Sequence, residues 1–123
     1  MSRILIIEDN HPNRYLSRFL LEANGLEVIE AVNGREGIRT ACEQKPDLII
    51  MDIEMPEMDG YEAATYLLQC PETARIPIIA ATSYALPGDR ARAAGVGFAD
   101  YIEKPFEPGE FIARVLKLLP PRP

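Results

Sequence analysis

Residues 47–60 of the chain read Asp-Leu-Ile-Ile-Met-Asp-Ile-Glu-Met-Pro-Glu-Met-Asp-Gly. The apolar run Leu48–Met51 is typical of a strand that is buried on both faces of a parallel sheet. Asp52 follows this run and places a carboxylate where the strand ends. Asp59 then precedes a helical pattern over residues 60–68. The stretch predicts a buried strand, an acidic loop and a helix in succession.

The same alternation of a short apolar run and a longer amphipathic segment occurs five times along the chain. It predicts a parallel sheet with helices on both faces. The predicted strands are Ile4–Ile7, Val28–Ala31, Leu48–Met51, Ile76–Ala81 and Tyr101–Ile102. Capping residues, prolines and glycines predict one helix over His11–Asn24, one from Gly34, one over residues 60–68, one ending at Gly95 and one from Pro108.

The polarity of the five runs predicts their order in the sheet. The first, third and fourth runs are almost wholly apolar, whereas the second and fifth are short and are interrupted by Glu30 and Glu103. The order 2-1-3-4-5 places those two runs at the edges and needs only right-handed crossovers. The predicted fold is therefore α/β: a doubly wound, five-stranded parallel sheet of the flavodoxin-like type with five helices.

Length and composition limit the classes of protein to which the chain can belong. Its 123 residues suit one domain, residues 1–123, and the final Leu-Pro-Pro-Arg-Pro predicts no output domain after it. No apolar stretch approaches the ~20 residues of a membrane span, and the start lacks a signal peptide, so we expect a cytoplasmic protein that does not enter membranes.

Net charge and cysteine content exclude further classes of protein. A net charge of −6 is the wrong sign for direct nucleic-acid binding. Cys42 and Cys70 show neither a C-x-x-C spacing nor a metal spacing with the single histidine, His11, and are interpreted as reduced packing residues.

Polar side chains follow four of the five predicted strands. They are Glu8, Asp9, Asp52, Thr82 and Lys104, and the carboxyl ends of parallel strands meet at one edge of the sheet. Three carboxylates brought together there repel one another unless a cation neutralises them. Mg²⁺ prefers such oxygen ligands together with water and a substrate phosphate. The pattern predicts a magnesium site, with a set of solvated strand-end acids as the alternative.

These motifs resemble the CheY-like receiver domains of response regulators over essentially the whole chain. The resemblance is carried by Ile-Ile-Glu-Asp-Asn at residues 6–10, by the stretch at residues 47–60, by Ala-Thr-Ser at residues 81–83 and by Glu-Lys-Pro at residues 103–105. The acid pair, the aspartate, the hydroxyl and the Lys-Pro pair occur in the family's order. A chain with no output domain resembles the free-standing regulators of the DivK and CheY class.

The resemblance implies a role for each motif residue. Asp52 would accept a phosphoryl group from a phosphohistidine, and Lys104 would contact that group. The metal ligands would be Glu8, Asp9, Asp52 and the main-chain carbonyl of Glu54, holding Mg²⁺, for which Mn²⁺ can substitute. Thr82 and Tyr101 would be the switch pair, the ring turning inward after phosphorylation. Glu54 and Tyr84 would tune the rate of dephosphorylation, with the Tyr84 ring shielding the acyl phosphate from water.

The implied function is that of a two-component phosphorelay response regulator and not of a metabolic enzyme. Its partners would be a sensor histidine kinase or a histidine phosphotransfer protein and a downstream protein target, with the chain a monomer or weak dimer. On the helix at His11–Asn24, the apolar pattern predicts that Tyr15, Leu16, Phe19, Leu20 and Ala23 are buried and that Leu21 faces outward, where a partner helix would dock.

Three other functions share the predicted fold. A magnesium-dependent phosphohydrolase of the haloacid-dehalogenase type would favour Asp-x-Asp where this chain has Asp52 and Glu54, and it would need residues for a cap. A non-phosphorylated protein-binding module leaves the acid, hydroxyl and lysine set unexplained. A flavin-binding electron carrier is rejected, because the loop after Ile7 is acidic where a phosphate cradle would be required.

Overall fold

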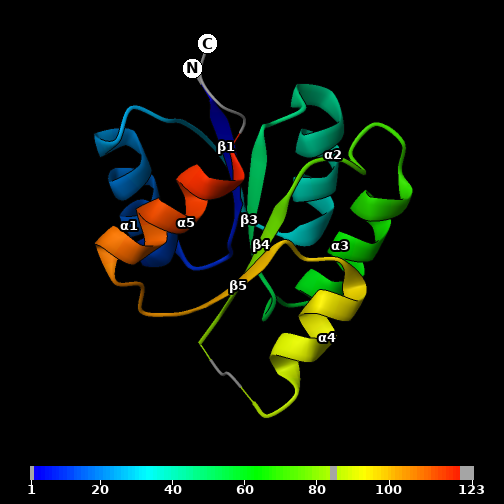
Figure 1. Ribbon diagram of the computed structural model, residues 1–123. Coiled ribbons are helices and arrows are strands. Elements are labelled where there is room, and N and C mark those ends of the chain that lie inside the picture. The colour runs from blue at the N-terminus through cyan, green and yellow to red at the C-terminus, as the bar shows by residue number, and fades with distance from the viewer. Residues whose placement is uncertain (1, 84–85, 120–123) are drawn as a thin grey trace.

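The computed structural model describes residues 2–83 and 86–119, which form one five-stranded parallel sheet with helices on both faces (Figure 1). The strands pair in the predicted order β2-β1-β3-β4-β5. They are β1 (Arg3–Ile7), β2 (Glu27–Ala31), β3 (Leu48–Asp52), β4 (Ile78–Thr82) and β5 (Asp100–Glu103). The three apolar runs are thus the inner strands, since a strand covered on both faces has no exposed side to carry polar residues.

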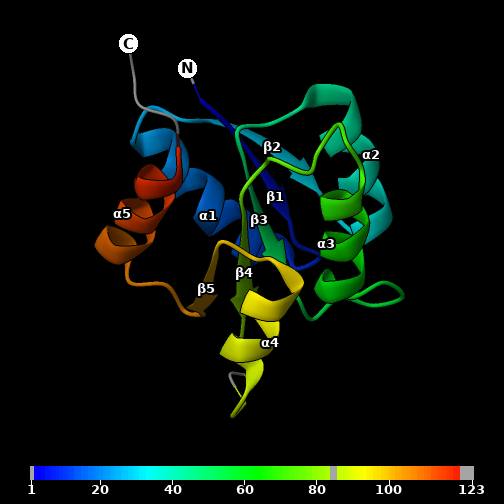
Figure 2. The ribbon, with the colours of Figure 1, turned by 45° about the vertical axis from the view of Figure 1, so that its right-hand side comes forward.

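The helices lie in two layers. They are α1 (His11–Ala23), α2 (Gly34–Gln44), α3 (Gly60–Gln69), α4 (Asp89–Val96) and α5 (Pro108–Leu118). Helices α1 and α5 cover one face of the sheet, and α2, α3 and α4 cover the other (Figure 2). Each face of the sheet has its own hydrophobic core, and alternate residues of a strand point into one core or the other. In β1, Leu5 and Ile7 pack against the layer of α2, α3 and α4, and Ile4 and Ile6 pack against the layer of α1 and α5. Among the described residues, no helix is long and apolar enough to cross a membrane.

Side-chain caps mark the start of four of the five helices, α4 being the exception. Asn10 caps α1 by accepting a hydrogen bond from the Asn13 backbone N–H at 2.9 Å, and Gly25 follows the helix with a φ of 78°. Several predicted boundaries shift by one or two residues, and two of these shifts have a local cause. Helix α4 continues through Gly95 to Val96 and ends at Gly97, whose φ is 115°. Strand β4 begins at Ile78 and not at Ile76, and Pro77 has no N–H to donate to a neighbouring strand.

The predicted burial of α1 was wrong for four of the five residues expected inside. Leu20 packs half-buried against the core, but Ala23 is exposed. Tyr15, Leu16 and Phe19 are 64%, 46% and 58% exposed, whereas Leu21 and Ser17 are buried. The face of α1 that packs on the sheet carries the largely buried Arg14 side chain besides Leu21, so it does not look apolar in the sequence. Arg14 pairs with Glu30 at 3.4 Å, and Arg18 Nη1 donates to Glu30 Oε2 at 2.6 Å.

Candidate functional site

The carboxyl-terminal edge of the sheet gathers the polar residues that the sequence singled out. Asp52 is the last residue of β3 and Thr82 the last of β4, while Glu8 and Asp9 follow β1 and Lys104 follows β5. Asp52, Thr82 and Glu8 are buried, and Asp9 is exposed. The sheet thus brings all five side chains to one edge, as predicted from the parallel topology.

The three carboxylates form a cluster that fits a hard cation. Glu8, Asp9 and Asp52 each offer a carboxylate oxygen, and these oxygens all lie within 4.8 Å of one another. Oxygen donors of this kind suit Mg²⁺, which binds few carboxylates and keeps positions for water and phosphate oxygens. The donor set and its spacing therefore allow the cluster to bind a divalent metal ion.

Lys104 lies beside two of the acids. Its Nζ donates a hydrogen bond to Glu8 Oε1 at 2.5 Å and lies 3.5 Å from Asp52 Oδ2. The lysine side chain is 11% exposed, so water screens these ion pairs less than it would at the surface. A compact ammonium group therefore lies ready to contact oxygen atoms that arrive at Asp52.

The pKa values of Asp52 and Glu8 shift in opposite directions. Burial, followed by the hydrogen bond with Glu8, raises the pKa of Asp52 from 3.8 to about 8. Burial also acts to raise the pKa of Glu8, but hydrogen bonds with Asp52 and Lys104 outweigh it and leave that pKa lowered. Of the two acids, Asp52 therefore holds a proton more readily than Glu8 does, and a cation bound between the carboxylates would favour the ionised form of both.

The Glu54 side chain makes contacts that the sequence did not predict. The Thr82 hydroxyl donates to Glu54 Oε2 at 2.6 Å, and the Ser83 backbone N–H donates to Glu54 Oε1 at 2.9 Å. The Glu54 backbone N–H in turn donates to Asp52 Oδ1 at 3.0 Å. Glu54 thus joins the ends of β3 and β4 across the cleft. No motif indicated this, because the contact depends on how the loop after Asp52 turns.

Gly60 fixes the path of that loop. Its N–H donates to the Ile53 carbonyl at 3.1 Å, closing the loop against the end of β3. A Cβ at this position would lie 2.6 Å from Ile53 Cα and 2.8 Å from the Asp52 carbonyl oxygen. Backbone atoms cannot move away cheaply, so only glycine allows α3 to begin this close to Asp52.

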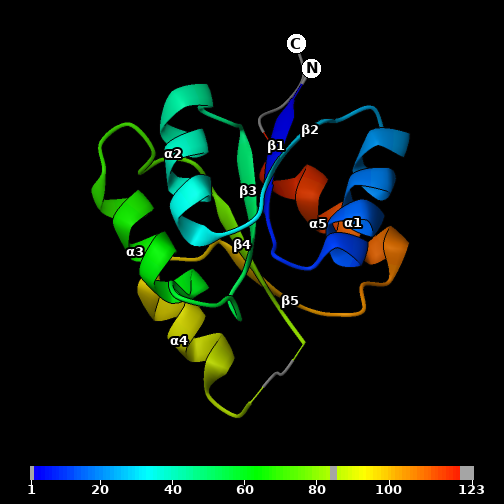
Figure 3. The same ribbon diagram turned by 180° about the vertical axis from the view of Figure 1, so that it is seen from behind.

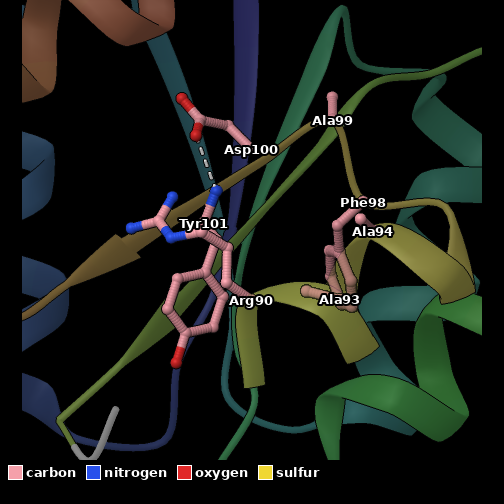
Figure 4. Close-up of a pocket in the computed structure, with 7 residues that line it drawn as sticks. All are labelled: Arg90, Ala93, Ala94, Phe98, Ala99, Asp100 and Tyr101. Carbon is pink, nitrogen blue, oxygen red and sulfur yellow. Dashed lines mark hydrogen bonds between the residues drawn. The ribbon is translucent and has the colours of Figure 1, made fainter. Parts of the chain in front are cut away.

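Tyr101 is buried beside a pocket between α4 and β5 (Figure 4). The guanidinium of Arg90 lies 5.1 Å from the centre of the Tyr101 ring, within the range of a cation–π contact. The Tyr101 hydroxyl is buried and has no hydrogen-bond partner among the described residues. The ring therefore lies inside the molecule and is covered by an arginine from α4. Tyr84, to which the sequence assigned a shielding role, lies outside the described residues.

The comparisons with known proteins agree with this geometry. Residues 4–116 match the model of the response regulator receiver domain family. The polar-differentiation response regulator DivK of Brucella anthropi is 41% identical over 116 residues, which are 94% of each chain. DivK of Brucella ovis is 40% identical over the same share of each chain.

Solved structures show the same fold. The Vibrio cholerae chemotaxis protein CheY4 superposes with a TM-score of 0.91 at 28% identity, covering 97% of this chain and 99% of that one. The receiver domain of the Pseudomonas aeruginosa sensor histidine kinase PA1611, solved with a magnesium ion coordinated in its active-site cleft, superposes with a TM-score of 0.85 at 36% identity, covering 94% of each chain. The sheet order, the acidic cluster and these matches together show that the chain belongs to the response regulator receiver domain family of two-component signalling.

Proposed function

We propose that Asp52 accepts a phosphoryl group from the phosphohistidine of a partner protein and that the modified chain signals to a further protein. The observation that carries the proposal is the place of Asp52: a buried carboxylate at a strand end, beside Glu8 and Asp9 and 3.5 Å from the Lys104 ammonium. The chain is a receiver domain and not a metabolic enzyme. Its groups would assist their own phosphorylation, with the donor supplying the phosphoryl group.

In the proposed reaction, an Asp52 carboxylate oxygen attacks phosphorus while the bond from phosphorus to the donor imidazole nitrogen breaks. The imidazole leaves as a neutral base after taking a proton from solvent. Transfer of this kind requires alignment and charge neutralisation more than a strong nucleophile. Mg²⁺, held by Glu8, Asp9, Asp52 and the Glu54 carbonyl, would supply part of that neutralisation when bound, and Mn²⁺ would serve in its place.

Lys104 and Thr82 would receive the transferred group. The Lys104 ammonium is 3.5 Å from Asp52 Oδ2 and would move its hydrogen bond from Glu8 to a phosphoryl oxygen. Thr82 and the Ser83 N–H now donate to the Glu54 carboxylate. A phosphoryl group that takes these donors must therefore displace Glu54. This competition gives Glu54 a physical means of setting how fast the phosphoryl group is gained and lost.

The conformational change on phosphorylation would start at Thr82 and reach Tyr101. A hydroxyl drawn toward the phosphoryl group changes the packing at the end of β4, next to the buried Tyr101 ring on β5. Arg90 covers that ring from α4, so a change in the ring position reaches the surface at α4 and β5. We expect a downstream protein to read this surface. The role of Tyr84 in shielding the acyl phosphate remains a prediction.

A phosphohistidine-bearing partner would dock on α1. Leu21, on which the sequence based this docking surface, is buried, but Tyr15, Leu16 and Phe19 are exposed on the same helix. They offer an apolar surface to a partner helix. We expect the chain to meet its kinase or phosphotransfer protein in the cytoplasm, as a monomer or weak dimer.

Intact-mass measurement after incubation with acetyl phosphate and Mg²⁺ tests the proposal. Wild type should gain the mass of one phosphoryl group, and Asp52→Asn should gain none. Lys104→Ala should fold but gain the group more slowly, since the incoming dianion loses one cation. A gain of mass in Asp52→Asn, or none in folded wild type, would contradict the proposal.

A further inference from the structure

We propose that Cys42, Cys70 and Glu72 form a second metal site, which binds a thiophilic divalent cation of the Zn²⁺ class. One ligand atom from each residue lies within 4.8 Å of the other two. The proposal is independent of phosphorylation at Asp52, because the two sites share no residue. It also changes the interpretation of the cysteines, which the sequence alone had assigned to packing.

The fold brings the two thiols together from distant positions. Cys42 lies in α2, and Cys70 is the residue that ends α3. Helices α2 and α3 contact each other and run side by side (Figure 3). Both follow strands of one parallel sheet and return along it, so their carboxyl-terminal ends lie at the edge of the sheet opposite Asp52. The chain contains two cysteines in all, and both lie at this place.

A hydrogen-bonded turn holds two of the ligands. The Cys70 carbonyl accepts from the backbone N–H groups of Thr73 and Ala74, at 3.1 Å and 2.9 Å. The Thr73 hydroxyl is buried and donates to the Leu67 carbonyl at 2.6 Å. These bonds fix the path of the chain through Glu72, between Cys70 and Thr73. The backbone that carries two of the ligands is therefore fixed before a cation arrives, which lowers the entropy cost of binding it.

The ligand set suits zinc more than magnesium. Zn²⁺ binds thiolates at about 2.3 Å in a tetrahedron, which places neighbouring sulfurs roughly 3.8 Å apart. The ligand atoms here need to close by no more than about 1 Å from the 4.8 Å limit. The two cysteines are half-buried and Glu72 is exposed, which leaves the fourth position open to water or to another ligand.

Metal binding at this cluster is coupled to loss of the thiol protons, because the thiolate is the form that binds a metal ion. Binding would form two sulfur–metal bonds and one oxygen–metal bond and release the two thiol protons to the buffer.

Titration of the reduced chain with Co²⁺ tests the proposal, because thiolate-bound cobalt absorbs by sulfur-to-metal charge transfer and carboxylate-bound cobalt does not. The sample contains a phosphine reductant and excess Mg²⁺, which occupies the acids near Asp52. We expect a charge-transfer band that saturates at one Co²⁺ per chain and is abolished by Zn²⁺. Zn²⁺ should also protect both thiols from alkylation in the wild type, a readout that needs no substitution.

Variants assign the ligands. Cys42→Ser and Cys70→Ser should each lose the band, and Glu72→Gln should keep it with an affinity roughly tenfold or more weaker. Glu43→Gln is the matched control and should bind nearly as the wild type does. Asp52→Asn should keep the full band, so a failure of phosphorylation and a failure of this site are distinguishable. Far-ultraviolet circular dichroism checks that each variant is folded.

Three results would overturn the proposal. The first is the absence of a charge-transfer band in folded wild type. The second is a band that survives both cysteine substitutions. The third is an intact mass lower by two hydrogen atoms under the same reducing conditions, which would show that the thiols form a disulfide in preference to binding metal.

Discussion

Protonation of Asp52 links the stability of the metal-free protein to pH. Its pKa is 3.8 for the ordinary group and about 8 in the fold. The native state therefore keeps a proton that the unfolded chain releases, and the free energy of unfolding falls as the pH rises through this window. The lowered pKa of Glu8 acts in the opposite direction, so the net effect is smaller than Asp52 alone would give.

We therefore predict that, in a chelator, the wild type loses on the order of 2 kcal/mol relative to Asp52→Asn between about pH 5 and about pH 8. Urea unfolding at several pH values measures this difference. Saturating Mg²⁺ should remove most of it, because a cation favours the ionised carboxylate. Glu103→Gln, which alters an exposed acid at the end of β5, serves as the control. Parallel pH profiles for wild type and Asp52→Asn would contradict the prediction.

Glu54 gives a second prediction for a single residue. Its carboxylate holds the Thr82 hydroxyl and the Ser83 N–H, and its charge repels an incoming phosphate. Glu54→Gln keeps an oxygen acceptor and removes the charge. We expect phosphorylation by acetyl phosphate to become about two- to fivefold faster, the effect of lowering the barrier by roughly 0.5–1 kcal/mol.

Glu57→Gln is the matched control for Glu54, because it removes an exposed charge from the same loop. Equal acceleration in both variants would assign the effect to the general electrostatic field and not to the contact with Thr82. Rates are measured by the mass change at Asp52 over time. A slower reaction in Glu54→Gln would show that Glu54 assists phosphorylation.

At the scale of secondary structure, Gly60 joins β3 to α3. Gly60→Ala places a methyl group 2.6 Å from Ile53 Cα, so the start of α3 must move. We predict a loss of about 1–3 kcal/mol in the free energy of unfolding, together with slower phosphorylation. Gly95→Ala, inside α4 with nothing within 4 Å of the added methyl, should instead stabilise by about 0.5–1 kcal/mol. Denaturant unfolding compares the two variants.

The strands could be predicted from the sequence more reliably than the orientation of α1. Buried strands leave a continuous apolar run, and the predicted run Leu48–Met51 is buried throughout. In α1 the apolar pattern gave the wrong face, because the partner of Arg14 and Arg18 is Glu30 on another strand. Periodicity within one helix carries no information on such a partner.

The residues of the candidate site also differ in how far the sequence could predict their contacts. Side chains at strand ends, such as Asp52 and Thr82, could be placed from the topology, because every parallel strand ends at a known edge. The bonds of Glu54 to β4 depend on loop geometry that no local pattern records. The meeting of Cys42 with Cys70 depends on how α2 and α3 pack. Sequence therefore placed the strand-end groups and missed the contacts made between loops and helices.

At the scale of the whole molecule, three large apolar residues of α1, Tyr15, Leu16 and Phe19, face outward. We predict that Phe19→Ala slows phosphotransfer from a phosphorylated histidine donor protein at least about tenfold, since anchoring aromatic residues dominate interfaces. Phosphorylation by acetyl phosphate, which needs no docking, should be unchanged. Tyr66→Ala removes a similarly exposed ring from α3 and is the control. Equal rates for Phe19→Ala and wild type would place the docking surface elsewhere.

The exposed apolar side chains of α1 also affect how readily copies of the chain associate with one another. At neutral pH the charge of −6 keeps copies of the chain apart. Near the isoelectric point of about 4.8 that repulsion disappears. We then expect copies of the chain to associate through the exposed side chains of Tyr15, Leu16 and Phe19. Light scattering should then show clustering in mildly acidic buffer that Phe19→Ala suppresses, so the proposed docking surface would also limit how concentrated the protein can become.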